Sequence, residues 1–333
     1  MEHSVKEIGK LAGVSPATVS RVINGSGAVT AEKRKRVLAA LEQLNGGRPA
    51  PRPRARTTGI GVLLPPEPAR DAHGILQKLC ALAAEMPRRW SLMLLPPDTL
   101  PLELEARHLR GELAGLMLIG HATDSRELAE TLQRIPHIWL NSHRDGDAVQ
   151  TTLMGNEFAG RIAARYLTAN DCAHCAVLSA PSGNPGFPGR VSGFRFELFS
   201  SGISCDTVEL ALPQEHSSLE TASDDELEKA LESALPAILA GGFDGVFSPE
   251  ERMTALLCRV FARAGVAGPP RLVSCNHTPE YFAGLHPRPA SIDLGPRMLA
   301  ELALKELLRR ISGAPPRADQ VAAIVTPQLV PGD

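Results

Sequence analysis

The feature that most constrains this fold is a regular alternation of short β-type runs with helical stretches, which begins at Gly59 and continues for about 250 residues. The apolar runs are IGVLL (60–64), SLMLL (91–95), LMLI (116–119), HIWL (137–140), CAVLS (175–179), GVFS (245–248) and LVSC (272–275). The helical patterns lie near 72–86, 102–110, 125–134, 157–169, 188–201, 224–240, 252–264 and 297–311. A strand–helix–strand order predicts parallel sheets with helices on both faces. Since this stretch is too long for one compact open sheet, we expect two doubly wound α/β lobes.

Residues 1–45 are predicted to form a separate all-α unit of three short helices. A turn through Gly13 separates the first helix from the second. Ser15 suits the N-cap of the second helix, and Pro16 suits its first position. Thr30 suits the cap of the third helix.

Residues 46–58, GGRPAPRPRARTT, have a different composition and are predicted to be a linker. Three prolines rule out a continuous helix and favour an extended polyproline II geometry. Arginines lie between or just after these prolines, at Arg48, Arg52, Arg54 and Arg56. The linker is therefore expected to be both stiff and basic.

Charge is divided unevenly along the 333 residues, although the formal net charge at pH 7 is only −2. Residues 1–58 hold eleven basic and four acidic residues, a net charge of +7. Residues 59–333 hold the remaining 24 basic and 33 acidic residues, a net charge of −9. A basic end on an acidic body indicates a polyanion partner for that end alone.

Several other classes of protein are excluded by the sequence. No apolar run approaches the roughly 20 residues that cross a bilayer, and the first ten residues lack the apolar segment of a secretory signal. Six cysteines are too few for a disulfide scaffold, so we expect reduced thiols and a cytoplasmic protein. A hydrophobic content of 43% excludes bulk disorder. Because no GxSxG or HExxH motif occurs, we expect neither an enzyme nor a cofactor.

The second predicted helix has the properties of a DNA-reading element. Small N-terminal residues let a helix enter the major groove, where Arg21 can bond guanine and Ala17 can touch a thymine methyl group. The predicted DNA-binding residues of this unit are Ser15, Pro16, Ala17, Thr18, Ser20, Arg21, Asn24 and Thr30. The helix pattern alone leaves open the alternative of a small helical domain that binds protein.

The segment EIGKLAGVSPATVSRVINGSGAVTAEKRKRVLAALEQLN resembles, nearly position by position, the DNA-binding headpiece of the LacI/GalR family of bacterial transcription regulators. The shared features are the AGVS turn, the TVSRVIN recognition helix, the Val-Thr start of the third helix and the terminal Leu-Asn. A looser resemblance continues to about residue 330 and implies a core of the type I periplasmic-binding-protein-like fold. The lobes expected on this basis are lobe 1, about 59–168 and 292–320, and lobe 2, about 169–291 and 321–330.

This resemblance implies a homodimer in which two headpieces read a pseudo-palindromic operator in double-stranded DNA. It also implies a small effector that binds between the lobes and changes their relative angle, and so the spacing of the headpieces. We therefore expect a ligand-responsive transcriptional regulator that acts as a repressor. The alternative is a sugar- or nucleoside-binding module whose headpiece no longer reads an operator.

The linker departs from the family pattern, in which a short hinge helix inserts a leucine into the minor groove. No leucine occurs between Asn45 and Ile60, and the prolines break any helix. Two interpretations stay open. In the first interpretation, Arg48, Arg52 and Arg54 are DNA-binding residues that lie, together with Arg56, in a narrow minor groove. Otherwise the linker is a solvated spacer whose arginines contact phosphates loosely.

The predicted effector site departs from the family as well. Arg190 matches the family's effector-binding arginine, and Glu251 stands where an aspartate is common. Asn156 and Asn276 replace two common aspartates, and amides hold cationic or hydroxyl groups less strongly than carboxylates do. With Arg190 kept, we expect a neutral or anionic effector of the sugar, sugar-derivative or nucleoside class. A degenerated pocket, or another binding geometry, stays open.

Further candidates for the effector site follow the predicted strands, because ligands bind at the carboxyl ends of parallel strands. These candidates are His121, Asn141, Arg144 and His277. The motif Cys172-Ala173-His174-Cys175 has no second pair at zinc spacing and precedes a strand, so we expect no metal. The glycine-rich stretch 183–189 is interpreted as a flexible loop that leads to Arg190.

Overall fold

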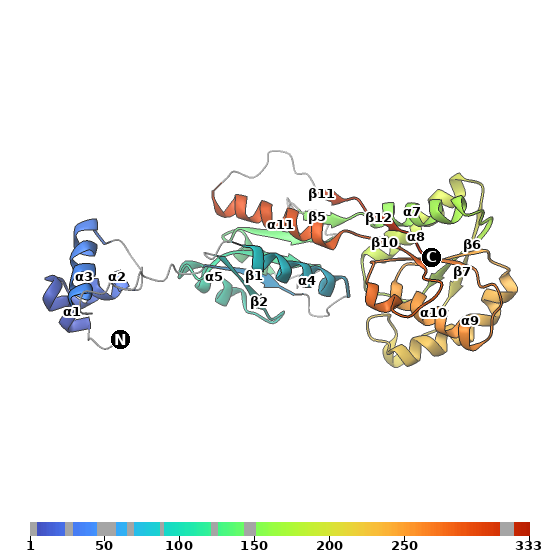
Figure 1. The fold of residues 1–333 in the computed structure, drawn as a ribbon, viewed down its shortest axis with the longest axis horizontal. Helices are drawn as coiled ribbons and strands as arrows, with labels where there is room; N and C mark the ends of the chain where they lie inside the picture. The colour runs from blue at the N-terminus through green and yellow to red at the C-terminus, as the bar shows by residue number, and fades with distance from the viewer. Residues whose placement is uncertain are drawn as a thin grey trace.

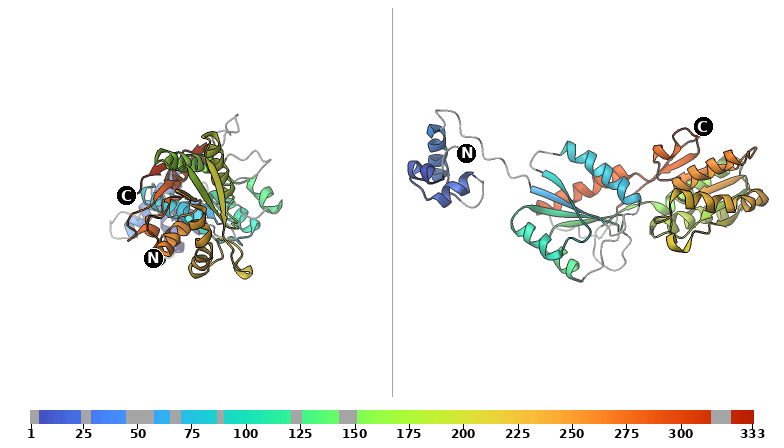
Figure 2. Two further views of the ribbon diagram at one scale, coloured as in Figure 1. Left: turned by 90° about the vertical axis from the view of Figure 1, so that its right-hand side faces the viewer. Right: turned by 90° about the horizontal axis from the view of Figure 1, so that it is seen from below.

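The computed structural model describes residues 5–23, 29–44, 58–64, 70–86, 90–120, 126–142, 151–313 and 323–333. Figure 1 shows a helical headpiece at the N-terminal end and two α/β lobes beside each other, with the C-terminus in the second lobe. The view from below in Figure 2 shows the same three bodies.

The headpiece consists of three helices, as the sequence predicts, which are α1 (Val5–Ala12), α2 (Pro16–Ile23) and α3 (Ala31–Leu44). Their apolar sides meet in one core that contains Ile8, Ala12, Val19, Val22, Val37 and Ala40. The turn between α1 and α2 depends on glycine, because Gly13 has a φ of +63°. A Cβ on Gly9 would lie 2.9 Å from the carbonyl oxygen of Val14. These contacts fix α2 against α1.

The first lobe is built on a six-stranded sheet in the order β11-β5-β4-β3-β1-β2, and all its pairs are parallel. Its strands are β1 (Thr58–Leu63), β2 (Trp90–Leu95), β3 (Leu113–Ile119), β4 (His137–Leu140), β5 (Thr151–Met154) and β11 (Ala323–Val325). Its helices are α4 (Arg70–Glu85), α5 (Pro101–Leu109), α6 (Arg126–Leu132) and α11 (Pro296–Ile311). Along β3, Met117 and Ile119 share a core with α4 and α11, whereas Leu116 and Leu118 share one with α5 and α6.

The second lobe is built on another six-stranded sheet, in the order β12-β10-β9-β8-β6-β7, in which only the β10–β12 pair is antiparallel. Its strands are β6 (His174–Ser179), β7 (Ser204–Glu209), β8 (Gly245–Ser248), β9 (Arg271–Cys275), β10 (Ala290–Asp293) and β12 (Gln328–Val330). Its helices are α7 (Asn156–Ala169), α8 (Gly186–Ser200), α9 (Asp224–Gly241) and α10 (Glu251–Arg263). Val177 shares a core with α7 and α8, and Leu178 shares one with α9 and α10. The prediction of two doubly wound lobes is confirmed.

The chain passes between the lobes at three points within the described residues, after β5, after β10 and after β11. The amide of Gly155 donates to the carbonyl oxygen of Val325 at 3.1 Å, so two of these crossings are hydrogen bonded. A Cβ on Gly155 would lie 2.7 Å from that oxygen, and one on Gly295 would lie 2.6 Å from Cγ1 of Val325. The crossings therefore pack so closely that glycine is needed at two of them.

Two segments lie in the lobe opposite to the one expected from the sequence. α7 falls within the predicted first lobe, 59–168, but it packs on α8 and on strands of the second-lobe sheet. β11 falls within 321–330 of the predicted second lobe, but it pairs with β5 in the first-lobe sheet. The positions of the crossings determine which sheet each segment joins. The strands before the crossings, β5, β10 and β11, are short and contain too few apolar residues for the sequence to predict these positions.

Candidate functional site

The N-terminal turn of α2 is held by Ser15. The carbonyl oxygen of Ser15 accepts the amides of Thr18 and Val19 at 2.9 and 3.1 Å, and its Oγ accepts the Thr18 amide at 3.2 Å. The two hydroxyl groups, Ser15 Oγ and Thr18 Oγ1, lie 2.9 Å apart. Ser15 and Thr18, two of the predicted DNA-binding residues, are therefore also part of the cap that starts the helix.

α2 separates its buried and exposed side chains cleanly. Val19 and Val22 are in the headpiece core, whereas Pro16, Ala17 and Arg21 are exposed to solvent. With these residues on its exposed side, α2 can approach base edges with little obstruction.

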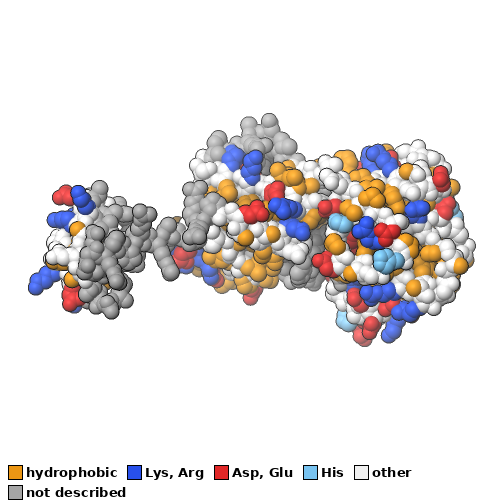
Figure 3. Space-filling model, viewed as in Figure 1, with side chains coloured by type: hydrophobic (Ala, Val, Ile, Leu, Met, Phe, Trp, Pro, Cys, Tyr) orange, Lys and Arg blue, Asp and Glu red, His pale blue; other side chains and the backbone are white. Residues whose placement is uncertain are grey.

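The rest of the headpiece supplies positive charge and a second capped helix. Thr30 Oγ1 accepts the amide of Lys33 at 3.4 Å and so starts α3, as predicted. The exposed cations of the described headpiece include Lys6, Lys10, Lys33, Lys35 and Arg36, and Figure 3 shows Lys and Arg side chains projecting from it. Asn24, Arg48, Arg52, Arg54 and Arg56 lie outside the described residues.

A small polar cavity that is open to solvent lies in the second lobe. It opens at the carboxyl ends of β6, β8 and β9, where open α/β sheets bind ligands. Its lining residues are Ser182, Asn184, Phe187, Arg190, Leu219, Glu220, Glu250 and Asn276. Of the predicted effector residues, the structure places Arg190 and Asn276 in this cavity.

Arg190 is fully buried, and two of its hydrogen-bond partners are neutral oxygens. Its Nε donates to Oδ1 of Asn156 at 2.9 Å, and its Nη1 donates to the carbonyl oxygen of Pro249 at 2.8 Å. Asn156 is not one of the lining residues. It holds Arg190 instead of facing the cavity, which is a different role from the predicted one.

The glycine-rich stretch before Arg190 differs from its prediction as a flexible loop, because Gly186 and Gly189 belong to α8. A Cβ on Gly186 would lie 2.7 Å from the side chain of Asn156. Glycine at this position therefore lets α8 begin directly against the residue that orients Arg190.

Asn276 occupies a constrained position after β9. Its φ is +106°, and its amide donates to the carbonyl oxygen of Ile292 at 2.9 Å. Its Oδ1 is buried and has no hydrogen-bond partner among the described residues. A buried acceptor without a donor costs free energy, so this atom is poised to accept from a bound molecule.

Two cavity carboxylates, Glu220 and Glu250, are absent from the predicted set. Glu220 accepts from Ser182 Oγ at 2.6 Å and from the Gly183 amide at 3.0 Å. Burial by itself would raise the pKa of Glu220, but these hydrogen bonds outweigh it and lower the pKa. Glu250 is 9% exposed and follows Pro249, the residue directly after β8.

These carboxylates add negative charge that the sequence-based expectation for the effector did not include. The expectation of a neutral or anionic effector was based on Arg190 and on the two amides Asn156 and Asn276. With both lining glutamates ionised, the cavity carries a formal charge of −1, which disfavours an anionic ligand.

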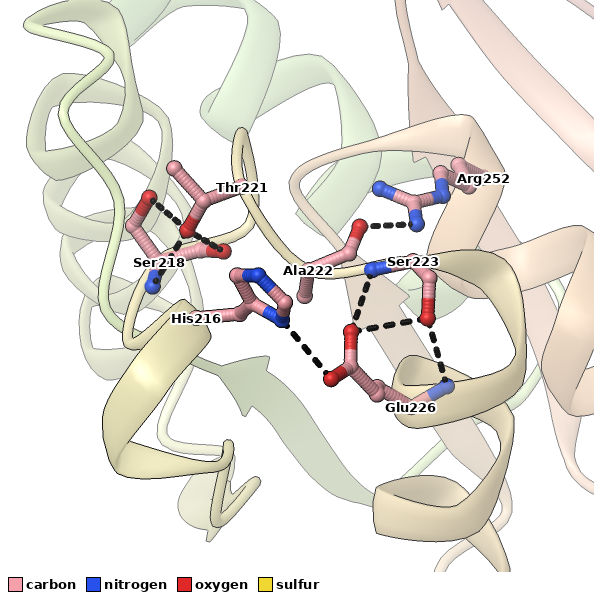
Figure 4. A network of polar contacts seen from close by, with 7 residues as sticks. All are labelled: His216, Ser218, Thr221, Ala222, Ser223, Glu226 and Arg252. Carbon is pink, nitrogen blue, oxygen red and sulfur yellow. Dashed lines mark hydrogen bonds and ion pairs between the residues drawn. The ribbon is translucent and has the colours of Figure 1, made fainter.

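A short segment, here called the strap (residues 214–223), brings Leu219 and Glu220 to the cavity. Arg252 holds the strap through its backbone. Arg252 is 1% exposed, and its guanidinium donates to the carbonyl oxygens of Leu219 and Ala222 at 3.0 and 2.6 Å. Figure 4 shows Arg252 on one side of the strap and a second anchor, the His216–Glu226 pair, on the other. Nδ1 of His216 lies 2.8 Å from Oε1 of Glu226.

Glu226 also completes a capping box at the start of α9. It accepts from the amide and the hydroxyl of Ser223, both at 2.7 Å, while Ser223 Oγ accepts the Glu226 amide at 3.2 Å. The bonds from His216 and Ser223 lower the pKa of Glu226 to about 2, and the carboxylate raises the pKa of His216. Both ends of the strap are thus tied to α9 and α10.

The remaining predicted effector residues lie elsewhere. Glu251 is buried and accepts from Oγ of Ser291 and from the amide of Thr278, so it joins α10 to its own lobe. Burial raises its pKa. Asn141 Oδ1 accepts the Met154 amide at 3.3 Å in the first lobe. His277 is outside the lining set, and His121 and Arg144 lie outside the described residues.

The two cysteines of the Cys172–Cys175 motif are buried. Burial raises the pKa of Cys175 to about 12, so its thiol is neutral at physiological pH and a poor nucleophile. Within the described parts of the chain, no group of His, Cys, Asp and Glu side chains has the arrangement of a metal site. In the same residues, no helix is both long and apolar enough to cross a membrane.

Comparisons with known proteins identify the headpiece. A family model described as "Bacterial regulatory proteins, lacI family" matches residues 4–45. The chain is 48% identical over 67 residues to the HTH-type transcriptional regulator MalR of Streptomyces coelicolor, which covers 20% of this chain and 19% of MalR. It is 27% identical over 212 residues to the HTH-type transcriptional regulator GalS of Salmonella typhimurium, or 60% of this chain and 61% of GalS. The matched part therefore spans about a fifth of the first relative's length.

Solved structures with the same fold extend along the whole chain. The lac repressor dimer bound to operator and the anti-inducer ONPF has a TM-score of 0.67 at 18% identity, and covers 100% of this chain and 98% of its own. The complex of the transcriptional regulator CelR with cellobiose has a TM-score of 0.61 at 20% identity, and covers 99% of both chains. The headpiece thus matches the lacI family model over residues 4–45, and the whole chain shares the fold of these regulators.

Proposed function

We propose that this chain is a sequence-specific DNA-binding transcriptional regulator that acts in the cytoplasm as a homodimeric repressor. The observation that carries the proposal is the presentation of α2, whose capped N-terminal turn exposes Pro16, Ala17 and Arg21 on a packed three-helix core. One such headpiece buries too little surface for tight specific binding, so two would read the halves of a pseudo-palindromic operator.

The second lobe supports control by a small molecule. The cavity lies at strand ends, and its lining is mostly polar side chains with Phe187 and Leu219 as apolar walls. CelR is similar in fold and its structure is a cellobiose complex. We infer a small polar effector of the sugar or nucleoside class, which would bias the angle between the lobes at their three crossings.

Selection of bound sequences from random DNA duplexes tests the proposal. We expect the intact chain to enrich one pseudo-palindrome, and Arg21→Gln to relax the preference at one base pair of each half-site by about 1–3 kcal/mol. Lys10→Gln removes the same charge from α1 and is the control, with a uniform loss of affinity at most. Enrichment of no palindrome would instead favour a ligand-binding module whose headpiece no longer reads DNA.

The linker arginines are a separate part of the proposal. We propose that Arg48, Arg52, Arg54 and Arg56 add to operator affinity. Replacing all four with glutamine should weaken binding and flatten its dependence on salt, because fewer counterions are released. An affinity and a salt slope equal to those of the unaltered chain would show that the linker is only a spacer.

A further inference from the structure

The charges around the cavity do not balance. Among the described residues, its charged lining consists of Arg190, Glu220 and Glu250, one cation and two anions. Arg190 already donates through Nε and Nη1 to oxygens of Asn156 and Pro249, which hold it against the cavity wall. A ligand therefore meets an excess of negative charge.

Hydrogen-bond donors near Glu220 are committed to the protein. Ser182 Oγ donates to Glu220 at 2.6 Å and also accepts the amide of Asn184 at 3.1 Å. The Gly183 amide donates to the other carboxylate oxygen at 3.0 Å. All of these donors are uncharged, so they orient the Glu220 carboxylate without neutralising it.

Two groups of the cavity can still accept hydrogen bonds from a ligand. A carboxylate oxygen accepts more than one hydrogen bond, so Glu220 can take a further donor beside Ser182 and Gly183. Asn276 Oδ1 is buried without a donor among the described residues. A ligand that only accepts hydrogen bonds would leave this oxygen unpaired, at a cost.

We propose that the cavity selects a small polar ligand that carries an ammonium group, an aminated polyol of the hexosamine class. Glu220 pairs with the ammonium, while Glu250 and Asn276 Oδ1 accept from the ligand's other N–H or O–H groups. Phe187 and Leu219 cover its C–H face. This inference rests on the proposed function, because it names the effector of the same regulator.

The strap explains why Glu220 can act as a selective partner. Its neighbour Leu219 is held through its carbonyl oxygen by the buried guanidinium of Arg252, and Ala222 is held in the same way. Arg252 also pairs with Asp224 at the start of α9. Arg252 is thus a positioning residue, which keeps the Glu220 carboxylate at the cavity wall before a ligand arrives.

Calorimetry and thermal shift on the full chain test the proposal with matched probes. The probes are glucose, galactose and mannose, their 2-amino-2-deoxy counterparts, the N-acetylated amines and the corresponding hexuronates. We expect an amino sugar to bind at least about tenfold more tightly than its hydroxyl and N-acetyl counterparts, and the hexuronates not to bind. Glu220→Gln should remove most of this preference, measured as the ratio of the two affinities in the same variant.

Glu215→Gln is the control, because it removes the same charge from an exposed position of the strap outside the cavity. It should keep the preference for the amino sugar. The proposal fails if a neutral or anionic probe binds best, if no probe binds, or if Glu220→Gln keeps the preference. Operator selection by the same preparation without sugar separates the two ideas, since its success with a failed sugar test overturns only the ligand class.

Discussion

Ionisation of His216 and Glu226 governs, at the scale of single residues, how firmly the strap is held. The pKa of His216 is raised above 6.5 and that of Glu226 is lowered to about 2. Protonated His216 therefore adds stability that is complete below 6.5 and is lost as pH rises through its raised pKa. Ionised Glu226 adds stability that is present above 4.5 and is lost as pH falls toward 2. The anchor is strongest between about pH 4.5 and 6.5.

A titration of the histidine ring signals by NMR checks this prediction. We expect His216 to titrate above 6.5, and Glu226→Gln to bring its pKa back toward that value. Glu232→Gln, on the same helix but paired with Arg263, should leave the titration of His216 unchanged. A His216 pKa that is equal in all three proteins would contradict the anchor.

Single residues also show what the sequence alone could and could not predict about the cavity. Arg190 was predictable because it matches the family pattern, and Asn276 because it stands where the family commonly has an aspartate. Glu250 was missed by one position, in favour of Glu251, although the strand-end rule applied to 245–248 points to it. Glu220 had no signal at all, since the strap has no periodicity and only the fold brings it to the cavity.

At the scale of elements, the contact between α7 and α8 depends on two glycines. A Cβ on Gly160 would lie 2.0 Å from the carbonyl oxygen of Arg190, and one on Gly193 would lie 2.1 Å from that of Glu157. Side chains at these positions would push the helices apart. The same separation would move Arg190 from Asn156.

Gly160→Ala should therefore destabilise the chain by about 1–3 kcal/mol, because an added methyl group overpacks a backbone contact. Gly74→Ala is the matched control: Gly74 lies within α4, and a methyl group added there would meet no described atom within 4 Å, so alanine should stabilise by about 0.5–1 kcal/mol. Urea denaturation measures both changes. Equal effects of the two substitutions would contradict the close helix contact.

The apolar runs and the periodic helices were predictable, and the remaining strands were not. The seven apolar runs and the helices after residue 70 lie where the sequence predicts them, within a few residues. The strands β5, β10, β11 and β12 have three or four residues each, and β7 (SCDTVE) is mostly polar at a sheet edge. Hydrogen bonds to neighbouring strands define them, and local sequence does not encode those neighbours.

At the scale of the whole molecule, exposed leucines mark a surface for the proposed dimer. Leu102 and Leu109 are 77% and 79% exposed, seven residues apart on α5, and Leu94 on the edge strand β2 is 55% exposed. Figure 3 shows hydrophobic side chains on the surface of the first lobe. An apolar face beside an unpaired strand edge is costly in a monomer.

Leu102→Asp combined with Leu109→Asp should shift the protein from dimer to monomer in sedimentation velocity and weaken operator binding by at least about tenfold, since one headpiece binds alone. Leu239→Asp is the control, at a leucine of the second lobe that is 48% exposed. It should leave the dimer intact. A double variant that stays dimeric would place the interface on another face.

The three crossings between the lobes also determine the order in which the chain can fold as it is synthesised. The headpiece needs only residues up to Leu44, and it can fold as soon as these emerge. The two sheets wait much longer, because β11 completes one edge at 323–325 and β12 completes an edge of the other at 328–330. Strands β5 and β10 therefore lack their outer neighbours until residues 323–330 have been made, when the DNA-reading part is already formed. The nascent chain is therefore most exposed to misassembly in its regulatory body and least in its headpiece.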